Sequence, residues 1–268
     1  MKKILFLLII GISYANLFAG VGYRDYYVAS PFKTSFLKDG QMFDFALGLN
    51  SFYTRINPNI DFQTSYCLTD RYDVFLNFFT KESNLNLNSE NKKFNSSTIE
   101  TKNFIELGLG AYKYSENYFS SEFFMSMGYG HQKDIYLLED NSYAGAQLGY
   151  LKLSIGVSYG ASLKNIEIGG SSRLSNAYFN RIKMISTEHL NPFSNKIAPL
   201  ESIEDLHYLS KQRNNLFLDQ GFAIRFGLQN VKLQLQLGYT LKLTQNDLSI
   251  NNGRSAIGLA FNIDKKKS

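Results

Sequence analysis

The sequence contains a single cysteine, Cys67, no tryptophan, and no apolar run long enough to form a membrane-spanning helix. A chain with one cysteine cannot form an internal disulfide, so backbone hydrogen bonds and packing must hold it together. The longest apolar run covers only residues 4–12, whereas a spanning helix needs about 18 or more. That run follows Lys2 and Lys3, and a basic start followed by a short apolar stretch is typical of a secretory signal.

The small residues after this run predict cleavage after Ala15 or Ala19. We therefore expect residues 1–19 to be a signal peptide and residues 20–39 to form a periplasmic N-terminal segment. Residues 40–264 then form the folded domain, and residues 265–268 form a C-terminal tail. No repeat of fixed period and no linker divides the folded part further.

Charge and motif content exclude several classes of function. The net charge is +5, and loss of the two signal lysines leaves +3, which is too mild to predict nucleic-acid binding. Phosphate-loop and dinucleotide fingerprints are absent. The three histidines, His131, His189 and His207, do not have the spacing of a zinc site. We therefore expect no cofactor, no metal and no nucleic-acid partner.

The clearest structural signal is an alternation of apolar and polar residues near the C-terminus. Seven apolar side chains fall on every second position: Val231, Leu233, Leu235, Leu237, Tyr239, Leu241 and Leu243. An amphipathic helix repeats every 3.6 residues, so this period of two predicts a strand. Its length exceeds that of a usual soluble strand and suits a tilted strand that crosses a membrane.

Similar alternation recurs along the chain and predicts about ten strands, with eight or twelve as alternatives. Two neighbouring runs are expected to form separate strands, one with outward Ala144, Ala146, Leu148 and Tyr150 and the next with outward Leu153, Ile155, Val157, Tyr159 and Leu163. The opposite faces are rich in glycine and polar residues, as suits a narrow interior. A mean hydropathy of -0.21 is too low for a helical membrane protein but fits a barrel in which one face of each strand meets lipid.

The connections between these runs alternate in length. Tight turns are expected at 69–71, 115–117, 151–152 and 229–230, and longer polar loops near 81–102, 133–142, 169–216 and 245–254. Short turns at one end and long loops at the other are typical of outer-membrane barrels. The sequence therefore predicts an all-β fold, an antiparallel up-and-down transmembrane β-barrel. A soluble barrel has no reason to keep its long loops at one end.

The predicted lumen face carries charges of both signs. Acids lie on the first five strands and bases on the later ones: Asp44, Asp61, Asp73, Glu106, Glu122, Lys164, Arg225, Lys232 and Lys242. A narrow barrel would let the two walls pair, and Arg225 is expected to reach Asp44 and Glu122 at similar depth. The alternative is a set of separate, solvated charges in a small pore.

One stretch of the sequence resembles a known group of proteins. It includes Glu204, Asp205 and Leu206, residues 216–227 and residues 231–236. Residues 27–40 and the turn at 68–70 are also similar. These segments resemble a family of small, uncharacterised Gram-negative outer-membrane β-barrel proteins and cover about half of the chain. The resemblance implies the barrel fold and a place in the outer membrane, and it is silent on activity.

Two patterns are compatible with catalysis, but the sequence around each of them argues against it. Gly156-Val157-Ser158-Tyr159-Gly160 matches the serine motif of hydrolases, yet that motif requires a sharp strand-to-helix turn and here lies inside an alternating run. His131 lies near Asp134 at the outer end of a strand, where a catalytic group would also need a nucleophile in reach.

We therefore expect no catalytic residues and a monomeric, non-enzymatic outer-membrane protein with a structural or surface-contact role. The expected partners are outer-membrane lipid and the barrel-insertion machinery. A narrow solute channel is the second hypothesis and a surface hydrolase the third.

Overall fold

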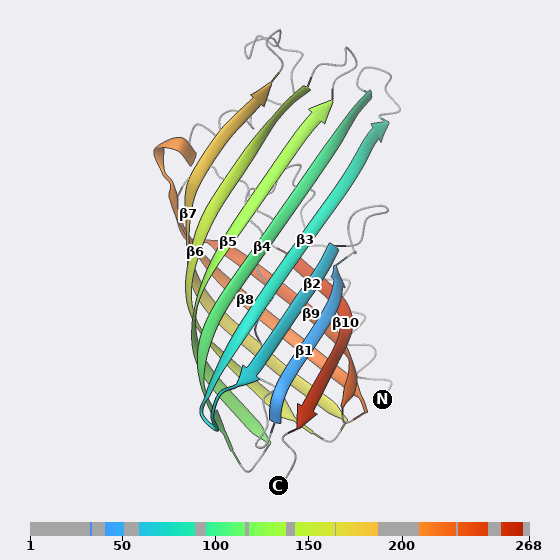
Figure 1. The fold of residues 1–268 in the computed structure, drawn as a ribbon, viewed down its shortest axis with the longest axis vertical. Coiled ribbons are helices and arrows are strands. Elements are labelled where there is room, and N and C mark those ends of the chain that lie inside the picture. The colour runs from blue at the N-terminus through green and yellow to red at the C-terminus, as the bar shows by residue number, and fades with distance from the viewer. Residues whose placement is uncertain are drawn as a thin grey trace.

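The described residues of the computed structural model form a closed antiparallel β-barrel of ten strands (Figure 1). The structure describes residues 33, 41–50, 59–88, 95–115, 118–137, 143–163, 165–186, 209–228, 230–245 and 253–264. Each strand pairs with the strand next to it in sequence, and β1 pairs with β10 to close the barrel. The predicted up-and-down barrel of about ten strands is confirmed. No helix within these residues is both long and apolar enough to cross a membrane.

The strands differ in length around the barrel. Their bounds are β1 Gln41–Asn50, β2 Asn59–Cys67, β3 Tyr72–Asn88, β4 Asn95–Tyr114, β5 Phe119–Leu137, β6 Tyr143–Ser162, β7 Ile166–Ser186, β8 Asn214–Gly227, β9 Val231–Lys242 and β10 Gly253–Asp264. Strands β3 to β7 have 17 to 21 residues, whereas the other five have 9 to 14. One wall of the barrel therefore rises well beyond the other, as Figure 1 shows at its upper end.

The strand register sets the tilt of the barrel. A row of paired residues that starts at Glu167 on β7 runs through β8, β9, β10 and β1 to β6 and returns to β7 at Phe179. The row is displaced from position 167 to position 179, which is a shear of 12 residues. For ten strands this shear corresponds to a tilt of roughly 40°, within the usual range for barrels. Because of the tilt, inward side chains from strands far apart in the row reach the same depth.

The outer surface carries an apolar belt with aromatic margins. Exposed aliphatic side chains such as Leu107, Met127 and Ile155 cover its middle, and the aromatic rings of Phe119 and Tyr129 lie at its edges on β5. Phe119 and Tyr129 are ten residues apart, which is about 33 Å along a strand and about 25 Å along the axis of a barrel with this tilt. That height matches the lipid-facing band of outer-membrane barrels.

The sequence-based assignment of β6 and β7 was wrong. The expected turn at 151–152 does not exist, because β6 continues through it, with Leu151 pointing outward and Lys152 buried inside. The expected long loop at 169–216 contains β7, and the tight turn lies between Ser162 and Ile166, where Leu163 N–H donates to the Ile166 carbonyl at 2.8 Å. The outward face of β7 includes Ser172 and other polar or small residues, so its apolar alternation was too weak to detect.

The direction of the first half of β6 was also predicted wrongly. Ala146, Leu148 and Tyr150 are buried inside the barrel and pack with Phe104 and Phe179, instead of facing outward. This region lies towards the long-loop end of β6. Beyond the apolar belt an outward face no longer needs large apolar residues, so the sequence pattern reverses there without a change in the strand.

The other tight turns lie where the sequence placed them. Strands β2 and β3 are joined at 68–71, where Thr69 Oγ1 accepts hydrogen bonds from the backbone N–H groups of Arg71 and Tyr72, both at 3.1 Å. Strands β4 and β5 turn between Tyr114 and Phe119, and strands β8 and β9 between Gly227 and Val231. The loops near 81–102 and 133–142 are shorter than predicted, because strand pairing continues in polar sequence.

Inward glycines make room for aromatic rings. A Cβ atom added to Gly108 would lie 2.2 Å from Phe75 Cζ and 2.7 Å from the Met125 carbonyl oxygen. The Phe75 ring is itself held edge-on against Phe124, with centroids 5.6 Å apart. The lumen at this level is therefore filled by phenylalanine rings, which the prediction of a glycine-rich interior did not foresee.

Gly108→Ala should consequently destabilise the barrel by about 1–3 kcal/mol, because the ring and the backbone cannot both move away. Gly48→Ala is the matched control, since the nearest atom to its added Cβ lies at 3.6 Å. It should be neutral or stabilising by about 0.5–1 kcal/mol, as glycine in a strand loses more conformational entropy than alanine. Urea unfolding in detergent micelles measures both, and equal effects would contradict the packing of Phe75 over Gly108.

Candidate functional site

The inward face of the barrel gathers most of the charges that the sequence singled out. Buried there are Asp44, Asp61, Asp73, Glu106, Glu122, Arg225 and Lys232. Lys242 lies near the end of β9 and is half-buried, and Lys164 lies outside the described residues. Charges buried in this way must be paired, because an isolated ion in a low-dielectric interior is very costly.

A lower network surrounds Arg225 on β8. Its guanidinium donates two hydrogen bonds to the carboxylate of Asp44 on β1, at 2.5 and 3.0 Å, and its Nε donates to Gln234 Oε1 at 2.6 Å. Glu167 on β7 lies 3.7 Å from Arg225 Nη1 and 3.1 Å from Lys232 Nζ. Since β9 and β10 separate β8 from β1, the Arg225–Asp44 pair spans part of the lumen.

Glu122 does not join this network, although the sequence placed it at the same depth. Glu122 and Asp73 both form ion pairs with Lys33 instead. Depth along the barrel was predicted correctly for Arg225 and Asp44, but the position of Glu122 around the barrel depends on the strand order and register. That information is absent from the residue pattern of a single strand.

A middle network is centred on Asp219 of β8, which is fully buried. Its Oδ2 atom accepts from Arg173 Nε at 3.1 Å, and it also accepts from Lys152 Nζ at 3.2 Å. Arg173 continues to Glu106 on β4, with Nη1 3.3 Å from Oε2. Two cations and two carboxylates thus neutralise one another, and the Arg173–Glu106 contact bridges strands that lie three apart.

Sequence reasoning missed Lys152, Glu167, Arg173 and Asp219. Lys152 fell on the misassigned turn and Arg173 in the misassigned loop, and Glu167 fell between the expected strand that ends at Leu163 and that loop, so their direction was not considered. Asp219 had a usable signal, because it lies six residues before Arg225 on the same strand and so shares its face.

An apolar layer lies toward the long-loop end of the lumen. It contains Phe79, Phe104, Leu148, Tyr150, Phe179, Leu209 and Phe217 among its buried members. Near the same end of β4, Glu100 forms ion pairs with Lys81, at 2.5 Å, and with Lys102. The lumen thus alternates charged and apolar layers along its axis.

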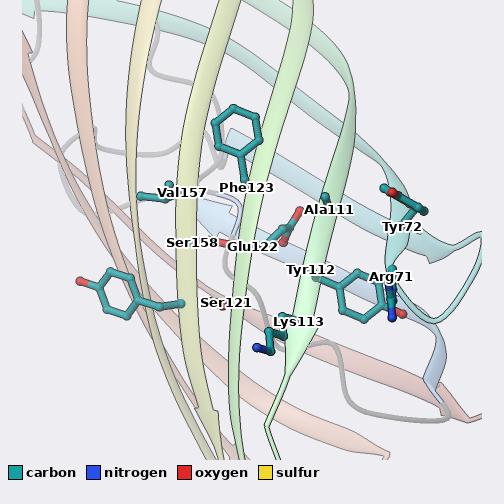
Figure 2. A pocket seen from close by; sticks show the side chains of 11 residues that line it. Arg71, Tyr72, Ala111, Tyr112, Lys113, Ser121, Glu122, Phe123, Val157 and Ser158 are labelled. Atoms are coloured by element: carbon teal, nitrogen blue, oxygen red, sulfur yellow. Dashed lines mark hydrogen bonds between the residues drawn. The ribbon is translucent and has the colours of Figure 1, made fainter.

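An open hollow of about 500 Å³ lies on the outer wall close to the tight turns (Figure 2). Exposed Tyr72, Phe123 and Tyr159 contribute to its lining, and the small side chains of Ala111 and Ser121 leave the space between them. Glu122 also borders it, although its side chain is buried on the inner face. The hollow lies at the margin of the apolar belt and is separate from the networks of the lumen.

The residues considered for catalysis are not assembled into a site. His131 and Asp134 are three positions apart on β5, so they lie on opposite faces, with Asp134 buried and His131 in contact with Gln147 on β6 at 2.8 Å. Ser158 lies within β6, and its hydroxyl donates to Glu122 Oε2 at 3.2 Å. Within the described ranges, no group of three His, Cys, Asp or Glu side chains could hold a metal ion.

Comparisons with known proteins identify the fold and no closer relationship. No family model and no curated protein sequence matches the chain. The outer membrane protease OmpT of Escherichia coli has a similar structure, with a TM-score of 0.52 and 9% identity over 86% of this chain and 100% of that one. The translocator domain of the autotransporter NalP from Neisseria meningitidis matches with a TM-score of 0.42 and 8% identity, over 82% of this chain and 86% of that one. The fold is that of an outer-membrane β-barrel.

Proposed function

We propose that this protein is an integral outer-membrane barrel whose lumen is closed by its own side chains, with a non-enzymatic structural or surface-contact role. The observation that carries the proposal is the stack of buried layers: the Arg225 and Arg173 networks and the aromatic layer beyond them. Paired charges and packed rings occupy space that a channel would leave to water. Lipid is the main partner, and the barrel-insertion machinery acts during biogenesis.

The long wall supports the surface-contact part of the proposal. Beyond the apolar belt, β4 to β7 continue with outward polar side chains that include Asn103, Lys133 and Lys183. Side chains of this kind suit water or a polar partner and do not suit lipid. The wall would therefore present a broad polar face outside the membrane.

A narrow solute channel is the second candidate, and conductance separates the two. Purified protein inserted into planar bilayers should carry no steady ionic current, because the buried layers leave no continuous aqueous path. Insertion is verified independently by co-flotation with lipid vesicles. A steady current from verified, inserted protein would replace the closed barrel with the channel hypothesis.

Lipid contact can be tested with two arginine substitutions on the same face of β4. Leu107 is 60% exposed within the belt. Asn103 lies four residues further along β4 toward the long loops, beyond the level of Tyr129 at the margin of the belt. Leu107→Arg should cost about 2–4 kcal/mol, and Asn103→Arg about 0–1 kcal/mol, because an arginine is costly only at mid-membrane depth. Reversible folding into lipid vesicles measures both, and equal costs would show that the belt does not face lipid.

A surface hydrolase remains the third hypothesis, and OmpT, named as a protease, shares the fold. At 9% identity that similarity carries no activity to this chain. The placement of His131 and Asp134 on opposite faces of β5 favours the non-enzymatic proposal.

A further inference from the structure

Two carboxylates converge in the part of the lumen near the tight turns. Asp73 on β3 and Glu122 on β5 lie on either side of β4 and share the space over Gly110. A Cβ atom at Gly110 would lie 2.0 Å from Glu122 Oε1 and 2.2 Å from Asp73 Oδ1. Both carboxyl side chains are completely buried. A cation between two buried carboxylates at such close quarters stabilises the ionised form of both.

The cation is supplied by Lys33. Its ammonium group forms ion pairs with both carboxylates and lies over the ring of Phe75, 4.1 Å from the ring centroid. Lys33 is only 5% exposed. Two carboxylates and one aromatic face together form a typical receptor for a primary ammonium ion, because each favours the charged form of the amine.

Lys33 does not belong to the barrel wall. It precedes the first residue of β1, Gln41, by eight positions, and it is the one described residue of the segment expected in the periplasm. Among the described residues, no lysine or arginine of the wall forms an ion pair with Asp73 or Glu122. Arg225 and Lys232 are directed toward Asp44 and Glu167 instead. The acid pair therefore has a place for an amine that the strands themselves do not fill.

We propose that Asp73, Glu122 and Phe75 form an amine-binding site inside the barrel, and that the side chain of Lys33 occupies this site as a plug. This proposal rests on the proposed function of a closed barrel and adds a specific contact to it. The plug adds a further layer of closure at the end of the lumen near the tight turns.

Amine acylation of the folded, full-length protein tests the location of Lys33. N-hydroxysuccinimidyl acetate is applied in detergent micelles, and peptide mass spectrometry measures acetylation at Lys33 and at two exposed lysines, Lys113 and Lys211. Lys33 should react at least about tenfold more slowly than both, because reaction requires local opening of the site. In urea the three rates should converge. Reaction of Lys33 at the rate of Lys113 in the folded protein would overturn the proposal.

The acid pair is tested by removing its charge and by supplying a free amine. Glu122→Gln should accelerate acetylation of Lys33 in protein that still shows the gel mobility of the folded barrel. Lys33→Ala should lower the melting temperature, and propylammonium should restore it more than propanol does, whereas Lys113→Ala should respond equally to both. No difference between propylammonium and propanol in Lys33→Ala would overturn the amine site.

The outcome is separable from the test of the closed barrel. A steady current through protein with a protected Lys33 would contradict the proposed function and leave the amine site in place. A silent barrel with a freely reactive Lys33 would contradict the plug alone.

Discussion

Asp219→Asn should destabilise the barrel by about 3–5 kcal/mol, the usual cost of breaking a buried ion pair from one side. The substitution keeps the size of the side chain but removes the charge that faces Lys152 and Arg173. Two buried cations would then share the single carboxylate of Glu106. Urea unfolding in detergent micelles measures the loss.

A second substitution distinguishes charge balance from lost hydrogen bonds. Lys152→Met combined with Asp219→Asn leaves Arg173 and Glu106 as a balanced pair. The double variant should therefore lose less stability than the sum of the two single variants, since contacting residues in one network are coupled by about 0.5–3 kcal/mol. Strictly additive losses would show that the middle network does not act as an ionic unit.

Arg225→Ala should also cost about 3–5 kcal/mol. Arg225 is 1% exposed and makes a two-point contact with Asp44, so truncation leaves that carboxylate buried without its cation. Arg71, which lies exposed in the turn between β2 and β3, is the control, and Arg71→Ala should stay within about 0.5 kcal/mol.

The pairing itself is measured by a double-mutant cycle. Asp44→Asn in the Arg225→Ala background should cost less than in the wild-type protein, because the unpaired charge is already present there. If Arg225→Ala unfolds no more readily than Arg71→Ala, the charges are solvated and the lumen is wetter than the packing indicates. The narrow solute channel would then be preferred over the closed barrel.

The two experiments concern contacts that the sequence predicts unequally well. It predicts that Arg225 and Asp44 meet, because their distances from neighbouring turns can be counted along their own strands. The sequence does not predict the Asp219 network, because Arg173 and Lys152 lie in stretches whose sequences resemble a loop and a turn. The mixed outward face of β7 explains that error: Gly170, Ser172 and Asn176 interrupt its apolar alternation, and backbone pairing with β6 and β8 does not depend on that alternation.

The sequence by itself determined the alternation of β9, the tight turns at 69–71 and 229–230, and the barrel class, because each depends on neighbours within a few residues. Only the tertiary structure decided which charges meet. The shear of 12 residues places Arg173 beside Glu106, which is 67 positions away in the sequence. Glu122 pairs instead with Lys33, which is 89 positions away. Strand pairing is cooperative around a closed ring, so each partner is set by the register of all ten strands together and cannot be read from any one of them.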